Sequence, residues 1–274
     1  MLKSIISFIG FNSYLGQKKL ASINNPRELI NYLKIPLKNF IEINNLSTSL
    51  SENLKKLYQQ NSSFYGPRIN IGGDHSMAIA TIADSLQKYP DLKVVWIDAH
   101  PDINTRNSSA TNNYHGMPLA FLSGLDHDST FNFIEKKLDL SNLIYLGIRD
   151  IDEYEQKIIN KHNITYYRVS ECEKNVPRVL TELDKVIGDN PIHISFDVDS
   201  LDPSVLDSTG TPVIGGLSLN IAQILLDYLA FKNWVNLDIT ELNLNLGNRE
   251  KSLNNLKLII NDFLKNNRNI RSHL

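Results

Sequence analysis

The hydrophobic residues of this chain fall into short apolar runs that alternate with longer amphipathic stretches. Short runs rich in β-branched and aromatic residues are typical of buried strands, whereas the stretches between them have the length of helices. Strands and helices that alternate at this spacing form βαβ units, so the expected fold class is α/β, three-layer αβα with a mostly parallel central sheet. We predict strands over residues 68–71, 93–97, 143–148, 164–169, 192–196 and 234–237, and helices over 77–89, from 116 onward, and over 152–162, 176–187, 217–230 and 252–264.

The N-terminal part of the chain is less regular. Residues 1–10 combine one lysine with a short apolar run, as a secretory signal peptide does. The run is too short for a signal peptide and lacks a cleavage site of small residues, so we expect an opening β-strand. Helices are expected near 26–33 and 50–60. Because no Pro-rich or Gly/Ser-rich linker interrupts the sequence, we expect one domain over residues 1–274, with an atypical N-terminal part.

Composition narrows the class of partner. The chain of 274 residues is 42% hydrophobic, and its 28 basic and 30 acidic residues give a formal net charge of −2. This balance provides no basic surface for nucleic acid or for an anionic membrane. Cys172 is the only cysteine, which excludes an internal disulfide and a cysteine-ligated zinc site. We therefore expect a cytoplasmic protein that binds neither nucleic acid nor membrane.

Acidic and histidine residues gather where the predicted strands end. One strand runs into Asp98-Ala99-His100-Pro101-Asp102, and another runs into Asp197-Val198-Asp199. Because side chains alternate along an extended chain, Asp98, His100 and Asp102 are expected on one face. Carboxylates this dense repel one another unless a cation lies between them. Oxygen ligands with some imidazole suit Mn²⁺ first and Fe²⁺, Co²⁺ or Zn²⁺ as substitutes. An Asp-rich set that includes His75 can bridge two ions, which predicts metal-assisted hydrolysis.

Several of these residues also have a purely structural interpretation. The acidic cluster after the strand 93–97 would suit a solvated turn, and Asp152 would suit the N-cap of the helix that follows it. Glu241 would suit a solvated loop. His193 lies deeper along its strand and is expected to be a core histidine with satisfied hydrogen bonds. Surface positions are expected for His127, His162 and His273.

Three motifs together resemble the signatures of the ureohydrolase (arginase/agmatinase) family, in the same order and at similar spacing. They are Gly72-Gly73-Asp74-His75-Ser76, Asp98-Ala99-His100-Pro101-Asp102 and Ser195-Phe196-Asp197-Val198-Asp199-Ser200-Leu201-Asp202-Pro203. The resemblance covers about residues 67–265 and implies an arginase/deacetylase-like fold with two Mn²⁺ per chain. It implies that a hydroxide bridging the ions attacks the substrate and that Asp102 steadies the attacking group. The six metal ligands that it implies are His75, Asp98, His100, Asp102, Asp197 and Asp199.

Within this family, the loop after Asp102 looks most like that of arginases. The resemblance implies that this loop binds the substrate α-carboxylate, that His115 shuttles a proton to the leaving amine, and that Glu241 pairs with the guanidinium. It thus implies hydrolysis of L-arginine to ornithine and urea by a homotrimer or homohexamer. The implied substrate-binding residues are Asn104, Thr111, Asn113, Asp152, Glu155 and Glu241, and the implied catalytic residues are His115, Asp102 and Glu241.

Other functions stay open at this point. A different ureohydrolase would keep the metals and act on agmatine, formiminoglutamate or another guanidino or amidino compound. A non-catalytic metal-binding relative would keep the ligands alone. The chain also departs from the arginase pattern in two places: its N-terminal third lacks the usual Gly-rich segment and Gly-Pro, and Arg106 stands where arginases often carry Pro.

Overall fold

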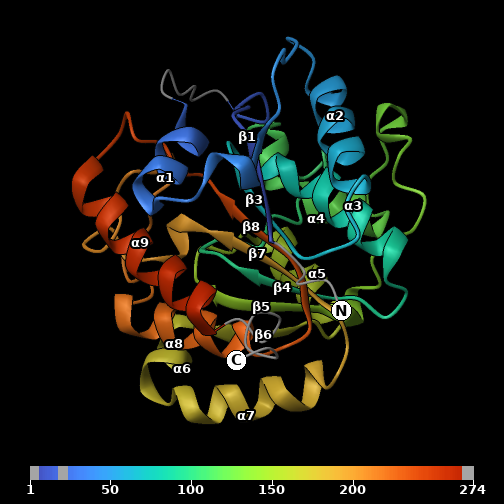
Figure 1. Ribbon diagram of the computed structural model, residues 1–274. Coiled ribbons are helices and arrows are strands. Elements are labelled where there is room, and N and C mark those ends of the chain that lie inside the picture. The colour runs from blue at the N-terminus through green and yellow to red at the C-terminus, as the bar shows by residue number, and fades with distance from the viewer. Residues whose placement is uncertain (1–5, 18–23, 267–274) are drawn as a thin grey trace.

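One parallel sheet organises the computed structural model, which describes residues 6–17 and 24–266 (Figure 1). Among these residues, eight strands follow the order β2-β1-β3-β8-β7-β4-β5-β6, and every neighbouring pair is parallel. The strands are β1 (Ser7–Phe11), β2 (Phe40–Glu42), β3 (Arg68–Gly72), β4 (Lys93–Ile97), β5 (Leu143–Ile148), β6 (Thr165–Arg168), β7 (Ile192–Asp197) and β8 (Trp234–Thr240). The first residues of the predicted opening strand and His273 lie outside the described ranges.

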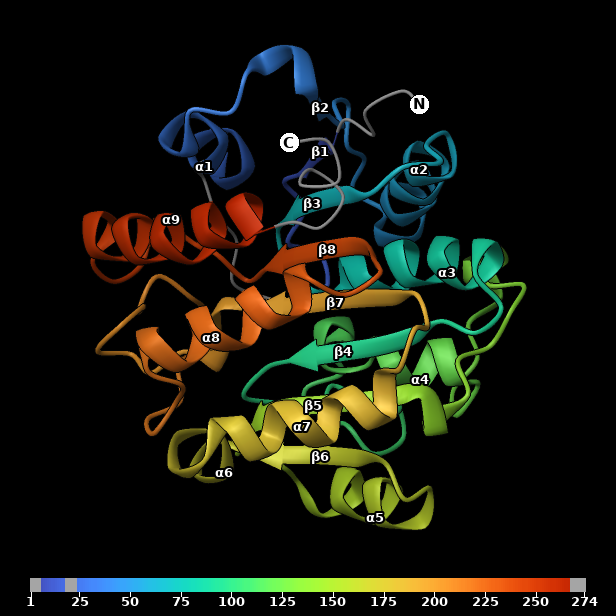
Figure 2. The ribbon, with the colours of Figure 1, turned by 60° about the horizontal axis from the view of Figure 1, so that its bottom comes forward.

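Two layers of helices cover the two faces of the sheet, so the predicted three-layer α/β fold is confirmed. Figures 1 and 2 show these layers on opposite sides of the strands. One face carries α1 (Asn25–Leu33), α6 (Val169–Lys174), α7 (Val176–Ile187), α8 (Leu219–Ala230) and α9 (Arg249–Asn266). The other carries α2 (Leu50–Ser62), α3 (Ala78–Lys88), α4 (Pro118–Ser123) and α5 (Glu153–Lys161).

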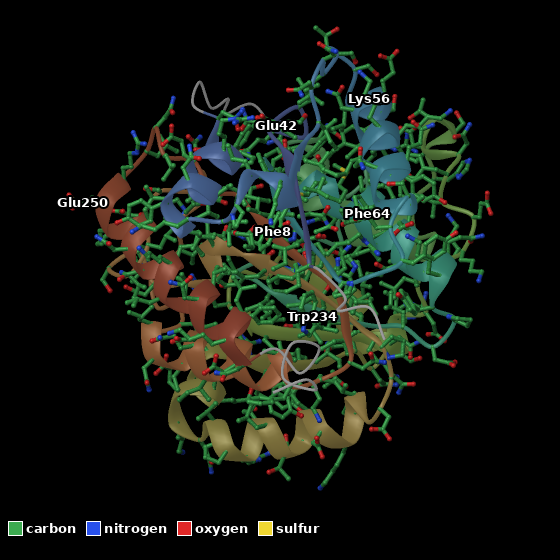
Figure 3. All side chains as sticks on the ribbon, viewed as in Figure 1. Phe8, Glu42, Lys56, Phe64, Trp234 and Glu250 are labelled. Atoms are coloured by element: carbon green, nitrogen blue, oxygen red, sulfur yellow. The ribbon has the colours of Figure 1, made fainter. Side chains whose placement is uncertain are left out.

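The strands are apolar on both faces because both faces are covered. Along β4, Val95 and Ile97 pack into one hydrophobic cluster, whereas Val94 and Trp96 pack into the other. This alternation is the two-residue period of an extended chain, with each face meeting its own helix layer. In Figure 3, Trp234 lies within the interior between sheet and helices, where it is 1% exposed. The described residues contain no helix that is long and apolar enough to cross a membrane.

The structure corrects the sequence prediction at three elements. The strand β2 and the helix α6 were not predicted. Three residues are too few to display a strand period, and α6 starts directly after β6 in a mostly polar stretch. The strand β8 extends to Thr240 instead of ending at residue 237, so Asp238 lies inside the strand and is fully buried. Asp238 therefore does not belong to the acidic groups at the strand ends.

The strand order decides where the predicted motifs meet. In a parallel sheet all carboxyl ends lie along one edge, which is where α/β proteins bind ligands. The neighbours β3, β8, β7 and β4 are the four strands that precede the His75, Glu241, Asp197 and Asp98 segments. Sequence segments more than a hundred residues apart are thereby placed side by side. A single domain over residues 1–274 stays a prediction.

Candidate active site

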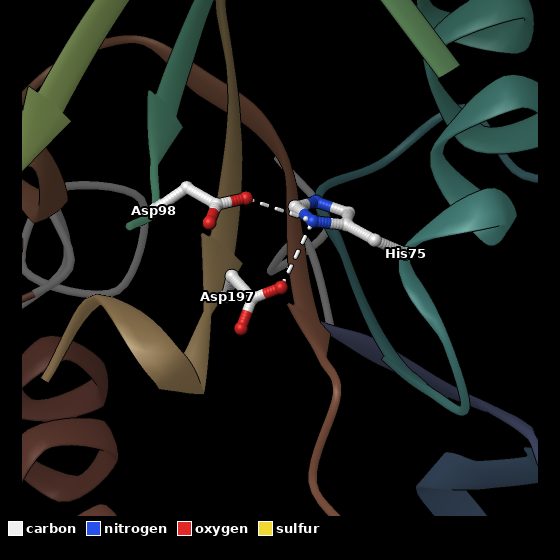
Figure 4. A group of neighbouring side chains, drawn as sticks. All are labelled: His75, Asp98 and Asp197. Carbon is white, nitrogen blue, oxygen red and sulfur yellow. Dashed lines mark ion pairs between the residues drawn. The ribbon is translucent and has the colours of Figure 1, made fainter. Parts of the chain in front are cut away.

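The first candidate metal group surrounds the Nδ1 atom of His75 (Figure 4). His75 begins the 3₁₀ turn after β3, Asp98 follows β4 directly, and Asp197 is the last residue of β7. Nδ1 lies 3.0 Å from Asp98 Oδ2 and 3.0 Å from Asp197 Oδ2. Asp102 Oδ2 lies 3.2 Å from the same atom. All four side chains are buried, so their ligand atoms converge away from bulk water.

A second group shares Asp98 with the first. Asp98 Oδ1 lies 3.4 Å from His100 Nδ1, which in turn lies 3.2 Å from Asp199 Oδ2. The two oxygens of one carboxylate therefore face two different histidines, which is the arrangement of a carboxylate that bridges two ions. The structure thus brings together all six residues that the sequence predicted as ligands. Their role as ligands stays a prediction.

The surroundings of His75 fit a divalent cation. Its Nε2 lies 2.8 Å from Ser195 Oγ, and its ring stacks on Trp96 with centroids 4.0 Å apart and planes 8° apart. These contacts fix the ring so that Nδ1 faces the carboxylates, yet Nδ1 has no hydrogen-bond partner among the described residues. A buried nitrogen without a partner, surrounded by carboxylate oxygens, is the donor set that Mn²⁺ or a similar ion accepts.

The charges of the group point to the same conclusion. Burial and the neighbouring Asp199 and Asp98 carboxylates raise the pKa of Asp197 well above its ordinary value. Burial and Asp98 likewise raise the pKa of Asp102 to about 6. Burial disfavours a charged His75, but the close carboxylates of Asp102, Asp197 and Asp98 outweigh it and raise the pKa of His75 well above its ordinary value. The metal-free site therefore retains protons that a bound divalent cation would displace.

Two residues at the site have left-handed backbone conformations. Asp102 has φ = 49° and Glu241 has φ = 63°, a region that residues other than glycine rarely occupy. The neighbouring backbone is held by hydrogen bonds from Ile103 N–H to Glu155 Oε1 (3.2 Å) and from Glu241 N–H to the Gly73 carbonyl (2.8 Å). Such strain concentrates at functional sites, where surrounding contacts hold it in place.

Above the two groups lies a cavity of about 270 Å³. It contains every predicted substrate-binding residue, and it adds Ser109, Asp150 and Thr211, which the sequence prediction missed. Seven of its residues are acidic, and no lysine or arginine of the described residues lines it, so the cavity suits a cationic ligand. Its lining consists of His100, Asp102, Asn104, Ser109, Ala110, Thr111, Asn113, His115, Gly116, Asp150, Asp152, Glu155, Asp197, Asp199, Thr211 and Glu241.

One wall of the cavity joins the loop after β4 to the start of α5. Asn104 Nδ2 donates to Asp152 Oδ2 at 2.7 Å. Asp152 caps α5 by accepting from Glu155 N–H at 3.0 Å, and Glu155 Oε2 accepts from Asp152 N–H at 3.3 Å. The structural interpretation of Asp152 as an N-cap is therefore confirmed, while the same side chain also lines the cavity. Burial and the Asp152 and Asp102 charges raise the pKa of Glu155 to about 8.

Another part of the cavity lining pairs His115 with Glu241. His115 Nδ1 lies 3.1 Å from Glu241 Oε1, which also accepts from His75 N–H at 2.9 Å. Glu241 is 2% exposed, so its interpretation as a solvated loop residue is wrong. Burial lowers the pKa of His115, but the hydrogen bond and charge of Glu241 outweigh it and raise this pKa to about 9. Burial raises the pKa of Glu241, yet His115 lowers it overall. At neutral pH the pair is therefore a charged one.

Two further residues that support the site escaped the sequence prediction. Arg149 donates to the carbonyls of Asp199 (2.8 Å) and Val213 (2.7 Å), so it ties the segment after β7 to a loop beside the cavity. An arginine directly after a strand, next to acidic motifs, was the available signal. Arg106 donates to Asp126 Oδ1 at 2.7 Å, which ties the loop after β4 to the segment after α4. Charge complementarity alone does not reveal that pairing.

Three of the histidines expected outside the site, His193, His127 and His162, lie outside it in the described part of the chain. His193 is fully buried, with Nδ1 2.9 Å from Ser85 Oγ and Nε2 2.9 Å from Asp238 Oδ2, so its prediction as a core histidine is confirmed. His127 is exposed and His162 is half-buried. Neither belongs to the candidate metal groups.

Comparison with known proteins identifies the family. A sequence model described as "Arginase family" matches residues 18–263. The chain belongs to the arginase family. The Plasmodium berghei arginase is 38% identical over 252 residues, which cover 80% of this chain and 71% of that one. The Glaciozyma antarctica arginase is 41% identical over 189 residues, or 65% of this chain and 55% of that one. In several of these relatives the match spans about half of the protein.

Solved structures of this family share the whole architecture. The Entamoeba histolytica arginase in complex with L-ornithine has a TM-score of 0.88 at 29% identity, covering 96% of this chain and 99% of that one. The Bacillus subtilis arginase has a TM-score of 0.86 at 28% identity, covering 94% and 98%. Formimidoylglutamase from Bacillus subtilis, at 20% identity and a TM-score of 0.81, is similar in fold alone.

Proposed function

We propose that this chain hydrolyses the guanidinium group of L-arginine to ornithine and urea and uses two Mn²⁺ ions to do so. The observation that carries the proposal is a single cavity whose lining includes residues of both candidate metal groups, Asp197 of the first and His100 and Asp199 of the second, together with Asn104, Asp152 and Glu241. The chain's membership in the arginase family supports the reaction class. The acidic lining supports a substrate with cationic groups.

The six predicted ligands would hold the metals. Asp98 would belong to both ligand sets, His75 with Asp197 and Asp102 would complete one, and His100 with Asp199 the other. When bound, two such ions supply Lewis acidity and bring the pKa of a water near neutrality, which makes a nucleophile available. Mn²⁺ is proposed because aspartate oxygens dominate the set and no thiolate joins it among the described residues.

The walls of the cavity would bind the two ends of arginine. Glu241, kept ionised beside His115, presents a buried carboxylate that suits the planar guanidinium. At the other wall, Asp152 and Glu155 would face the α-amino group. The loop residues Asn104, Thr111 and Asn113, to which the cavity adds Ser109, would bind the α-carboxylate. Binding at both ends would orient the guanidinium carbon over the metal groups.

His115 would supply the proton that the leaving amine needs. With a pKa of about 9, its ring carries hydrogen on both nitrogens at neutral pH. Glu241 Oε1 holds the hydrogen on Nδ1, so the hydrogen on Nε2 is the one available to the departing nitrogen. Glu241 would stabilise the charged ring of His115 until the proton is transferred, and it would keep the ring in the same orientation during the transfer.

Urea release tests the proposal. Purified protein incubated with MnCl₂ is assayed for urea with L-arginine and agmatine and for formamide with formiminoglutamate, beside a chelator-treated sample. We expect metal-dependent release of urea from arginine. Formiminoglutamate should be a poor substrate, because it would bring two carboxylates into an acidic cavity. Turnover of another substrate alone would replace arginine and keep the metal chemistry. Absence of turnover with metal tightly bound would favour a non-catalytic relative.

The loop assignment separates arginine from agmatine, which lacks the α-carboxylate. If Asn113 binds that carboxylate, Asn113→Ala should lower kcat/KM for arginine and reduce the preference for arginine over agmatine. An unchanged preference would show that the loop does not select the substrate. The exposed Lys185→Ala in α7 serves as a control far from the cavity lining.

Location and assembly complete the proposal. We propose the cytoplasm, which suits a chain whose single cysteine, Cys172, is buried and free. We propose a homotrimer or homohexamer on the basis of the family resemblance. Cell fractionation tests the first, and sedimentation velocity of the purified chain tests the second.

A further inference from the structure

Glu241 has a partner that reaches it from the N-terminal part of the chain. Gln17 Nε2 donates to Glu241 Oε2 at 2.7 Å, across 224 positions of sequence. The other carboxylate oxygen, Oε1, faces His75 N–H and His115 Nδ1. Among the described residues, the hydrogen bonds recorded for Oε2 come from Gln17 alone. Gln17 is 9% exposed and lies one residue before the stretch that the family model matches.

The segment that carries Gln17 is itself anchored to the site. Gly16 N–H donates to Asp74 Oδ2 at 2.7 Å, and the Gly16 carbonyl accepts from His115 N–H at 3.1 Å. Asp74 N–H donates to the Ser13 carbonyl at 3.0 Å. A side chain at Gly16 would collide with Asp74 and Ser76, with its Cβ only 2.5 Å from Asp74 Oδ1. The segment therefore holds Gln17 in a fixed position relative to both His115 and Glu241.

We propose that Gln17 is a positioning residue that fixes the plane of the Glu241 carboxylate for the guanidinium. Glu241 has a left-handed backbone, and its carboxylate receives donors at both oxygens. With Oε1 held by His75 and His115, the contact to Oε2 prevents rotation about the last side-chain bond. A planar guanidinium needs both carboxylate oxygens in one defined plane, so loss of this contact weakens recognition of that group. This inference rests on the proposed function.

The test compares two ligands that share one end and differ at the other. L-Arginine carries the guanidinium, whereas the product L-ornithine carries the same α-amino and α-carboxylate groups without it. Gln17→Met keeps the size of the side chain and removes the donor. We expect the KM for arginine to rise about 10-fold or more, the cost of one hydrogen bond to a buried charge, while the inhibition constant of ornithine stays within twofold.

Two controls make the result specific. Leu15→Ala alters an exposed neighbour in the same segment and should change neither constant. In a Glu241→Gln background, Gln17→Met should have no further effect on KM, because the two residues act as one unit. Gln17→Glu, which places a second carboxylate beside Glu241, should raise KM further, and it provides a second variant if Gln17→Met does not fold.

Each outcome has one meaning. A selective rise in the KM for arginine, absent from the Glu241→Gln background, supports the positioning role. An unchanged KM overturns it, as does an equal loss of arginine and ornithine binding, which would mean that Gln17 only stabilises the segment. If the wild-type protein loaded with Mn²⁺ releases no urea from arginine, the proposed function itself fails, and this inference fails with it.

Discussion

Asp197→Asn should stabilise the metal-free protein and destabilise the metal-loaded one. The ligand atoms of Asp197 and Asp98 lie within 4.8 Å of each other, and two charges at that distance repel by about 3.5 kcal/mol at an effective dielectric constant of about 20. The raised pKa of Asp197 means that protonation already relieves part of this repulsion. We therefore expect the substitution to add about 2–3 kcal/mol to the free energy of unfolding of the metal-free protein, or about 4–12 °C in Tm.

The geometry favours Asn over other replacements. Its oxygen can keep the hydrogen bond from Asp199 N–H, which Asp197 Oδ1 accepts at 2.8 Å. Its amide nitrogen would take the place of Oδ2, 3.0 Å from His75 Nδ1, where it can donate to that nitrogen once the ring is neutral. In the presence of metal, the wild type should be the more stable of the two proteins. At a metal concentration 100 times the Kd, binding adds about 2.7 kcal/mol to its free energy of unfolding, and the variant lacks one ligand.

The assay is calorimetry of both proteins in chelator and in excess MnCl₂, with the exposed Asp189→Asn as a matched control that should change neither Tm. The advantage of the metal-free variant should widen as pH rises. A raised carboxyl pKa means that wild type is protonated, and so resembles the variant, at low pH and becomes ionised only at higher pH. A metal-free variant less stable than metal-free wild type would refute the electrostatic reasoning.

Three further predictions concern other parts of the molecule. Arg106→Ala removes the ion pair with Asp126 that holds the loop after β4. Urea-release kinetics should show a KM for arginine up to about 5-fold higher and a nearly unchanged kcat. Arg106→Lys should restore part of the lost affinity for arginine. Asp84→Ala leaves the fully buried Arg68 without its ion-pair partner and should lower the free energy of unfolding by about 3–5 kcal/mol in urea titrations. His100→Asn disrupts only the second metal group, so elemental analysis after dialysis should find about one Mn²⁺ per chain instead of about two.

Much of the architecture was predictable because its signals are local. The strands β4, β5 and β7 are short apolar runs that end in acidic motifs, and a parallel sheet brings such ends to one edge. The pattern alone therefore predicts that Asp98, His100 and Asp197 lie at one edge of the sheet. The short edge strand β2 carried no such pattern and was missed.

The supporting contacts could not be predicted, because they join segments with no sequence relation. Gln17 lies in a stretch rich in polar residues, and nothing near it indicates a partner 224 positions away. Arg149 likewise acts through backbone carbonyls, which every residue possesses, so its partners leave no trace in the sequence. Asp238 directly follows the strand predicted over 234–237, yet it lies inside the longer β8, where His193 and Thr81 satisfy its carboxylate.

The strand order has a consequence for folding during synthesis on the ribosome. In the sheet, β3 and β4 are not neighbours. They are separated by β8 and β7, which are the last two strands to be synthesised. The chain from the end of β3 to the start of β8 is about 160 residues, or about 8–32 s of synthesis at about 5–20 residues per second. The edge of β3 stays unpaired for that time, whereas the edge of β4 stays unpaired from the end of β4 to the start of β7, about 95 residues or about 5–19 s. Unpaired edges of this kind promote aggregation. Metal binding cannot shorten these intervals, because Asp197 is synthesised only at the end of β7 and Asp199 directly after it.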